Sequence, residues 1–302
     1  DVIFASGPPF TGHWLGAKLA REHDLPLVLD FRDPWTRATF YPDRPEWAAR
    51  IDRRLERSCL LQAARIVTVN EQIRDELQAS APELEADRFV VIPNGFDPAD
   101  FAGIARHPSR HWTIAHVGSL FASRVPYTLL EVLERWIAED PTVADEVRLR
   151  LVGRVCPEMI ERVSRPPLSE IVIQDGYVSH AESVQAMVDA DVLLLLTNEG
   201  AHDPGMITGK VFEYLGAGRP ILTLAESGEA TRILEMTGRG CAVAPRSAAE
   251  IRSALTSLRE GSRERTSSPP GSTDAFSRPA QAQTLAATLS NAVSGSVPGQ
   301  RT

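Results

Sequence analysis

The sequence predicts an α/β fold of two doubly wound parallel-sheet domains, and three observations support this prediction. Short apolar or β-branched runs alternate with helical stretches, as they do in βαβ units. The run at 192–196 is apolar at every position, which is typical of a strand buried on both faces of a parallel sheet. The length of 302 residues exceeds one ordinary domain of about 100–200 residues and leaves room for two.

The first domain is expected to alternate four strands with three helices. Its expected elements are a strand at 2–5, a helix at 12–22, a strand at 27–30, a helix at 45–64, a strand at 65–69, a helix at 71–79 and a strand at 89–92. The chain opens directly in a strand and without Met, so we expect this domain to be truncated at its N-terminus.

A turn signal at 93–97 and a polar stretch to about residue 110 separate the two domains. We expect domains at 1–108 and 109–260, a flexible Ser/Pro/Gly-rich linker at 261–274, and a C-terminal helix and tail at 275–302. The apolar spacing over 282–293 predicts a last helix, which must bury its stripe against another element.

The second domain is expected to resume the same alternation. Its expected elements are a strand at 113–117, a helix at 126–138, strands at 148–152 and 171–174, a helix at 181–190, a strand at 192–196, a helix at 210–217, a strand at 220–223, a helix at 228–237, a strand at 241–243 and a helix at 248–260.

Composition excludes several classes of protein. The net charge is -8 and no basic block stands out, which disfavours nucleic acid as a partner. No apolar run reaches the roughly 20 residues of a membrane span, and no signal peptide is evident. Cys59, Cys156 and Cys241 are odd in number and far apart, as expected of reduced thiols in a cytoplasmic protein.

Ligands of such sheets bind outside the carboxyl ends of the strands, so the loops after strands are the candidate sites. After the strand at 113–117 come Gly118, Ser119 and Arg124. The glycine admits a ligand to the backbone, the next helix start suits phosphate, and Arg124 could bind a diphosphate through two hydrogen bonds. The alternative is a plain turn with a solvated arginine.

Lys210 and Glu213 follow the most buried strand. A cation in the first turn of a helix is unfavourable for the helix dipole, and an anionic ligand would offset this. Glu213 lies on the same edge and could accept two hydrogen bonds from a ribose diol. The alternative is a surface ion pair on an amphipathic helix. The loop before the helix is a candidate for the donor sugar and phosphates through Gly205, Met206, Ile207, Thr208 and Gly209.

A third candidate loop contains Gly176, Tyr177 and Val178, which could hold a flat base; a tight turn with a core tyrosine explains it equally well. In the first domain, Arg32 and Asp33 follow a strand and offer polar contacts to a sugar or phosphate, or else an Arg–Asp pair that stabilises the loop. His13 stands near a helix start, where its pKa would be lowered, and a structural histidine is the better interpretation.

Five segments carry a resemblance to a known family. They are Asp-Phe-Arg-Asp-Pro-Trp at 30–35, Ile-Pro-Asn-Gly-Phe-Asp at 92–97, His-Val-Gly-Ser-Leu at 116–120, Gly-Tyr-Val-Ser-His at 176–180 and Gly-Lys-Val-Phe-Glu-Tyr-Leu-Gly-Ala-Gly-Arg-Pro-Ile-Leu at 209–222. In this order and spacing they resemble the family 4 (group 1) retaining glycosyltransferases. The resemblance runs from residue 1 to about residue 257.

The resemblance implies the GT-B fold, in which two Rossmann-like domains face a cleft. It also implies sugar transfer from a nucleoside-diphosphate sugar, with retention, to a glycan, lipid-linked or small-molecule acceptor. The second domain would bind the donor and the first the acceptor, with His13 on the acceptor side. No metal or cofactor is implied. Peripheral association with the inner face of the cell membrane and a last helix packed across the first domain are also implied.

We expect Arg124, Lys210, Arg32 and Asp33 to be catalytic. The resemblance places Arg124 where the family usually has a lysine for the diphosphate, and it assigns the ribose to Glu213. This chain departs from the family pattern at Gly205, where the first of two glutamates is expected, at Ser119 in place of an arginine, and at Arg32 in place of a histidine. The family's opening glycine-rich loop is absent. Two alternatives stay open, another GT-B sugar-nucleotide enzyme such as an epimerase, and a truncated non-catalytic nucleotide-binding remnant.

Overall fold

The computed structural model describes residues 1–36, 44–197, 209–263 and 273–294. The chain divides into two compact units, one of Asp1–Asn94 with Arg278–Thr302 and one of Gly95–Ser277. The boundary expected at residue 108 is therefore wrong. Phe96 and Phe101 pack in the core of the second unit, so the polar stretch after residue 94 belongs to that unit. The C-terminal helix packs with the first unit, as expected for the last helix.

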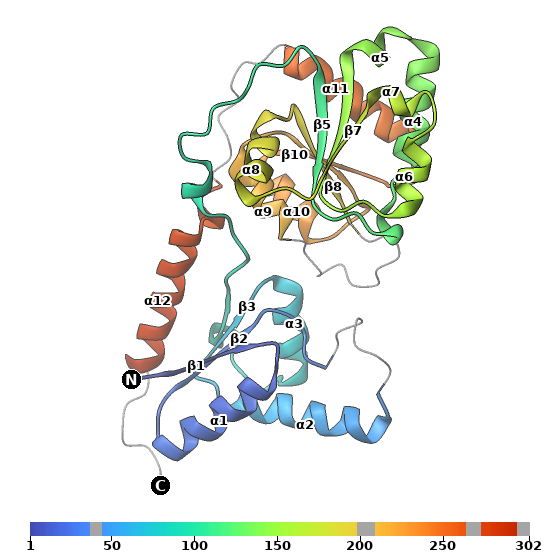
Figure 1. The fold of residues 1–302 in the computed structure, drawn as a ribbon. Coiled ribbons are helices and arrows are strands. Elements are labelled where there is room, and N and C mark those ends of the chain that lie inside the picture. Colours follow the sequence, from blue (N-terminus) through green and yellow to red (C-terminus); the bar gives the residue numbers. More distant parts are fainter. Residues whose placement is uncertain (37–43, 198–208, 264–272, 295–302) are drawn as a thin grey trace. The chain divides into compact units, whose positions relative to one another are not determined.

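The first unit contains a four-stranded parallel sheet in the order β1-β2-β3-β4 (Figure 1). Its elements are β1 (Ile3–Gly7), α1 (Thr11–His23), β2 (Leu27–Phe31), α2 (Glu46–Gln62), β3 (Arg65–Thr68), α3 (Glu71–Ser80), the 3-10 turn η1 (Ala86–Arg88), β4 (Phe89–Val91) and α12 (Arg278–Ser294). These agree with the expected elements to within a few residues.

Alternation along the strands divides the first unit's core between the two faces of its sheet. Leu29 and Phe31 of β2 face the cluster that contains buried residues of α1, α2 and α3. Val28 and Val67 face the other way, toward Ala292 of α12. The C-terminal helix thus covers the second face of the first unit's sheet, as its apolar stripe requires.

The second unit contains a six-stranded parallel sheet in the order β10-β9-β8-β5-β6-β7. Its elements are the 3-10 turn η2 (Pro98–Phe101), β5 (Trp112–Val117), the 3-10 turn η3 (Ala122–Arg124), α4 (Tyr127–Glu139), α5 (Thr142–Glu146), β6 (Val147–Val152), α6 (Pro157–Val163), α7 (Leu168–Ile171), β7 (Val172–Gly176), α8 (His180–Asp189), β8 (Val192–Leu196), α9 (Lys210–Ala217), β9 (Ile221–Leu224), α10 (Glu229–Thr237), β10 (Gly240–Val243), α11 (Ala248–Arg263) and the 3-10 turn η4 (Asp274–Phe276).

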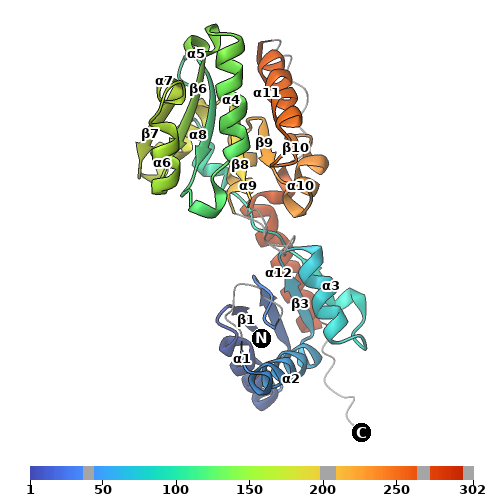
Figure 2. The same ribbon diagram turned by 90° about the vertical axis from the view of Figure 1, so that its right-hand side faces the viewer.

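Helices cover both faces of this sheet, as the apolar strands predicted (Figure 2). Ile114 and Leu194 belong to the cluster shared with α4 and α11. Ala115 and Leu195, the next residue of each strand, belong to the cluster shared with α8, α9 and α10. The unit is therefore doubly wound, and the carboxyl ends of its strands lie along one edge.

Three short helices and the end of α11 differ from the sequence prediction. The helices α5, α6 and α7 were not predicted, and each begins at or directly after a proline, namely Pro141, Pro157 and Pro167. Helix α11 continues to Arg263, so the first three residues of the expected linker at 261–274 are helical. The stretch 264–272 of that linker lies outside the described residues.

Candidate functional site

Three adjacent strands of the second unit end in glycines that lie side by side. Gly118, Gly153 and Gly176 follow or end β5, β6 and β7 with φ of +153°, +127° and +71°. The Gly118 amide donates to Val152 O at 2.8 Å, and the Gly153 amide donates to Gly176 O at 2.7 Å. A Cβ on Gly153 would lie 2.4 Å from the Gly118 carbonyl oxygen. This edge, the glycine edge, is bare backbone that a flat or charged ligand can approach.

Lys210 and Glu213 lie in the first turn of α9, at the same end of the sheet. Lys210 Nζ donates to Glu213 Oε2 at 2.7 Å, and about a third of each side chain is exposed. The Lys210 side chain reaches back to β5, because its Cε lies 3.5 Å from the position of a Cβ on Gly118. The structure therefore brings together two loops that the sequence analysis treated separately.

His116, on β5, is a residue of this site that the sequence analysis missed. It is buried, and its Nδ1 lies 3.0 Å from Leu194 O of β8. Burial, with smaller contributions from the charges of Lys210 and Arg124, lowers the pKa of His116 to about 4, so the ring is neutral at pH 7. The available signal was a histidine within the mainly apolar run Ile-Ala-His-Val at 114–117, two residues before Gly118.

Gly153 was missed too, although Val152-Gly153 repeats the Val117-Gly118 pattern of a glycine directly after a strand. Arg124 ends η3 and is half-buried, and its charge acts on His116, so its guanidinium belongs to the same edge of the sheet. Ser119 is exposed beside it.

The chain bends at Tyr177, directly after β7, and Tyr177 does not pack in the core. The Tyr177 side chain is 81% exposed, and the Arg154 guanidinium lies 5.7 Å from its ring centroid. Val178 packs against the core cluster under α8 and α9. The expected donor residues Gly205, Met206, Ile207 and Thr208 lie outside the described residues, whereas Gly209 is the exposed N-cap of α9.

In the first unit, Arg32 forms a polar cluster at the carboxyl ends of its strands. Arg32 Nη1 lies 3.4 Å from Asp30 Oδ1 and 3.3 Å from Ile92 O, and Nη2 donates to Asn94 Oδ1. Asp33 is half-buried next to it. Arg32 thus pairs with Asp30, which fits the interpretation that it stabilises the loop. About a third of the Arg32 side chain remains exposed.

His13 occupies a structural position in the first unit. Its side chain is fully buried, its Nε2 lies 3.1 Å from Asp30 O, and its ring packs 4.4 Å from the centroid of Phe31. Burial lowers its pKa. The structural interpretation of His13 therefore fits these contacts.

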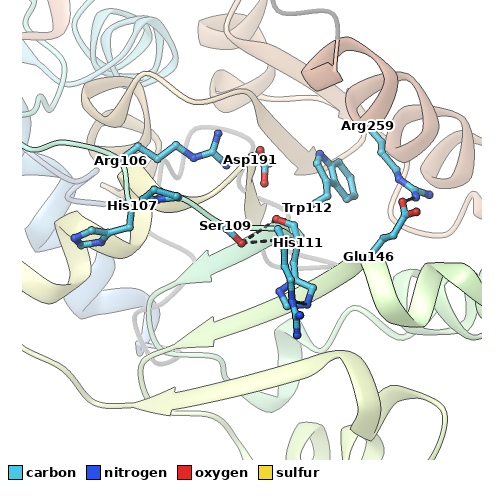
Figure 3. A pocket seen from close by; sticks show the side chains of 10 residues that line it. Arg106, His107, Ser109, His111, Trp112, Glu146, Asp191 and Arg259 are labelled. Carbon is cyan, nitrogen blue, oxygen red and sulfur yellow. Dashed lines mark hydrogen bonds and ion pairs between the residues drawn. The ribbon is translucent and has the colours of Figure 1, made fainter.

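A pocket of about 600 Å³ lies at the opposite end of the second unit's sheet (Figure 3). It adjoins Trp112 at the start of β5 and Asp191 just before β8. Arg106 Nη2 pairs with Asp191 Oδ1 at 2.6 Å, and Arg259 pairs with Glu146. Two of the pocket's arginines are therefore already paired with carboxylates, and the pocket lies at the end of the sheet opposite the glycine edge.

Two further observations concern the described part of the chain. It contains no group of three or more His, Cys, Asp or Glu side chains placed to hold a metal ion. None of its helices is both long and apolar enough to cross a bilayer. The three cysteines are free thiols, and burial raises the pKa of Cys59 to about 11, which makes its thiolate inaccessible at neutral pH.

Comparisons with known proteins concern the fold and the first 95 residues. Residues 1–95 match the family model described as a glycosyl transferase 4-like domain. No curated protein sequence matches the chain.

Solved structures resemble nearly the whole chain. The apo form of lipopolysaccharide outer core galactosyltransferase WaaB aligns with a TM-score of 0.64 at 16% identity, over 98% of this chain and 76% of that one. A UDP-forming α,α-trehalose-phosphate synthase from Burkholderia vietnamiensis gives 0.64 at 13%, over 98% and 73%. A Listeria monocytogenes protein assigned as a UDP-N-acetylglucosamine 2-epimerase gives 0.62 at 12%, over 98% and 76%. Residues 1–95 are therefore similar to a glycosyl transferase 4-like domain, and the chain has the two-unit fold of the GT-B glycosyltransferases.

Proposed function

We propose that this chain is a retaining glycosyltransferase that moves a sugar from a nucleoside-diphosphate sugar to a glycan, lipid-linked or small-molecule acceptor. The observation that carries the proposal is the placement of Lys210 against Gly118 at the glycine edge, with Glu213 as its ion-pair partner. A cation for phosphate, a carboxylate for a diol and bare backbone for a base then stand on neighbouring strand ends of one unit.

In the proposed reaction, the bond between the anomeric carbon and the diphosphate oxygen breaks. The acceptor hydroxyl oxygen bonds to that carbon on the same face, and the acceptor proton passes to the departing diphosphate. Lys210 and Arg124 would stabilise the charge that develops on the diphosphate, which is electrostatic preorganisation and needs no bound metal or cofactor.

Glu213 would hold the ribose through two hydrogen bonds to its diol. It now accepts from Lys210, so the ribose would replace the ammonium as its partner and release Lys210 toward the phosphates. Donor-sugar contacts would come from the loop 205–209, with backbone amides near Gly205 in place of a glutamate side chain.

On the acceptor side, we propose that Arg32 and Asp33 contact the sugar or phosphate of an acceptor, whereas His13 contributes through packing on Asp30. A lipid-linked acceptor would place the protein at the inner face of the cell membrane. Incubation with anionic vesicles, followed by sedimentation, tests that part of the proposal: a chain that stays in the supernatant at low salt argues against it.

The binding experiment is calorimetry of the full chain with UDP and with GDP. We expect saturable binding of one of them and its loss in Lys210→Met. The chain has only two lysines, so Lys18→Met, which removes an exposed i,i+4 pair with Glu22, is the matched control. If the wild type binds neither nucleotide, the proposal fails.

A second candidate function, sugar-nucleotide epimerisation, is favoured by the likeness to the Listeria protein assigned as an epimerase. Incubation of the chain with UDP-N-acetylglucosamine in the absence of an acceptor separates the two. Accumulation of an epimeric sugar nucleotide would replace the transferase proposal, whereas transfer that appears only with an added acceptor supports it.

A further inference from the structure

The imidazole of His116 has one nitrogen with a partner and one without. Nδ1 lies 3.0 Å from Leu194 O, and since a carbonyl only accepts, Nδ1 carries the proton in the neutral ring. The lone pair is therefore on Nε2. This atom is buried and finds no hydrogen-bond partner among the residues that the structure describes.

Nε2 is directed toward the glycine edge and the Lys210 side chain. It lies 3.8 Å from the position of a Cβ on Gly118, and Lys210 Cε lies 3.5 Å from the same position. The charges of Lys210 and Arg124 both act on the ring. The acceptor atom is thus within reach of a side chain that ends in three N–H donors.

A buried acceptor without a hydrogen-bond partner carries an uncompensated desolvation cost. Moving a donor to the acceptor removes this cost. Two side chains at this edge can donate, Lys210 and Arg124. Lys210 is the closer by geometry, because its methylene chain already lies over Gly118. Its ammonium donates to Glu213 Oε2 at 2.7 Å, which directs it away from Nε2.

We propose that His116 is a positioning residue of the donor site: when a nucleotide takes Glu213 as its ribose partner, the Lys210 ammonium donates to His116 Nε2 and is held beside the diphosphate. This inference rests on the proposed function. A neutral acceptor suits the role, because it fixes the ammonium without cancelling its charge, whereas a carboxylate would offset part of the attraction for phosphate.

Two substitutions separate this role from a purely structural one. His116→Asn keeps an N–H near Leu194 O but has no atom at the Nε2 position. His116→Gln can place its Oε1 near that position and gives up the bond to Leu194. We expect UDP to bind about tenfold to a hundredfold more weakly to His116→Asn, the range for one hydrogen bond to a charged group. His116→Gln should lie within about threefold of wild type.

A structural role predicts the reverse order, with His116→Asn close to wild type and His116→Gln impaired; that result would overturn the inference. Urea unfolding of each variant accompanies the titrations, so that loss of fold is recognised. His111→Asn, which changes a half-buried histidine at the other end of the sheet, is the control and should bind UDP as the wild type does.

Nitrogen-15 NMR of the wild-type histidines gives a readout that needs no variant. Without nucleotide, His116 should show a protonated Nδ1 and an Nε2 with no hydrogen bond. With saturating UDP, the Nε2 signal should move in the direction of an accepted hydrogen bond. UDP binding with an unchanged Nε2 signal refutes the role of His116 and leaves the proposed function standing, whereas absence of UDP and GDP binding refutes both.

Discussion

The Glu213 carboxylate is the residue on which the ribose assignment depends. Glu213→Ala should weaken UDP binding by about 1–3 kcal/mol, the range for losing hydrogen bonds to a charged group. Calorimetry of the full chain measures this. Glu161→Ala is the matched control, because Glu161 forms a highly exposed i,i+4 pair with Arg165 in the same unit. An unchanged dissociation constant for Glu213→Ala would exclude the ribose role.

His116 should also make stability depend on pH. Its pKa is lowered from 6.5 to about 4 in the folded chain, mainly by burial. Between these values the unfolded chain binds more protons, so the free energy of unfolding falls as pH falls from 6.5 to 4. The wild type should lose about 3 kcal/mol over this range relative to His116→Gln. Urea unfolding at several pH values checks this, and His13 is common to both chains. Parallel pH profiles would contradict the burial of a neutral His116.

The sequence was enough to predict which loop side chains pair with a neighbour, but it was not enough to predict which side chains are buried. Lys210 and Glu213 stand three residues apart in a helix, and their pairing follows from sequence spacing alone. The neutral state of His116 depends on packing between β5 and β8, where His116 and Leu194 are 78 residues apart in sequence. Tyr177, by contrast, was compatible with core or surface until the position of its turn at the sheet edge was known.

At the scale of elements, helix α9 is packed too closely against η2 to accept a side chain at Gly216. A Cβ there would lie 2.5 Å from the Phe101 ring and 2.7 Å from the Phe96 ring. Gly216→Ala should therefore destabilise the second unit by about 1–3 kcal/mol, the usual cost of overpacking, even though alanine favours helix.

Gly261→Ala is the matched control, because Gly261 is also helical but has open space at its Cβ. Alanine there should stabilise the chain by about 0.5–1 kcal/mol. Thermal unfolding of both variants gives the comparison. Equal effects of the two substitutions would mean that helix propensity, and not the contact with Phe101, determines the change in stability.

Long periodic elements were predictable, and short ones that begin with proline were not. Helix α9 over Lys210–Ala217 and strand β8 over Val192–Leu196 have the predicted bounds, because both carry a continuous apolar pattern. Helices α6 and α7 have only seven and four residues, which is too short for a helical period to stand out from the flanking prolines.

At the scale of the whole chain, the boundary between units was the least predictable feature. Composition placed it in the polar stretch that ends near residue 110, but units are defined by what packs together. Arg106 and His107 are fixed to the second unit by Asp191 and Asp189, contacts about 80 residues away in sequence. Polar residues in an apparent linker can therefore belong to a folded unit.

The C-terminal helix α12 should be essential to the first unit, although almost 200 residues of the second unit separate it from β4. It covers one face of that sheet with Ala292, Leu289 and Leu285, against Val28 and Val67. Removal of residues 278–302 should cost at least about 2 kcal/mol of unfolding free energy, since burying a single leucine contributes about 1.5–3 kcal/mol.

The matched control ends the chain at residue 294, which keeps α12 whole. Urea unfolding of both truncated chains should show a lower midpoint for the first unit only in the chain that ends at residue 277, with the second unit unchanged. UDP binding gives an independent check, because every donor-site residue named here lies in the second unit. If a chain that lacks 278–302 unfolds at the wild-type midpoint, packing of α12 on Val28 and Val67 does not contribute to the stability of the first unit.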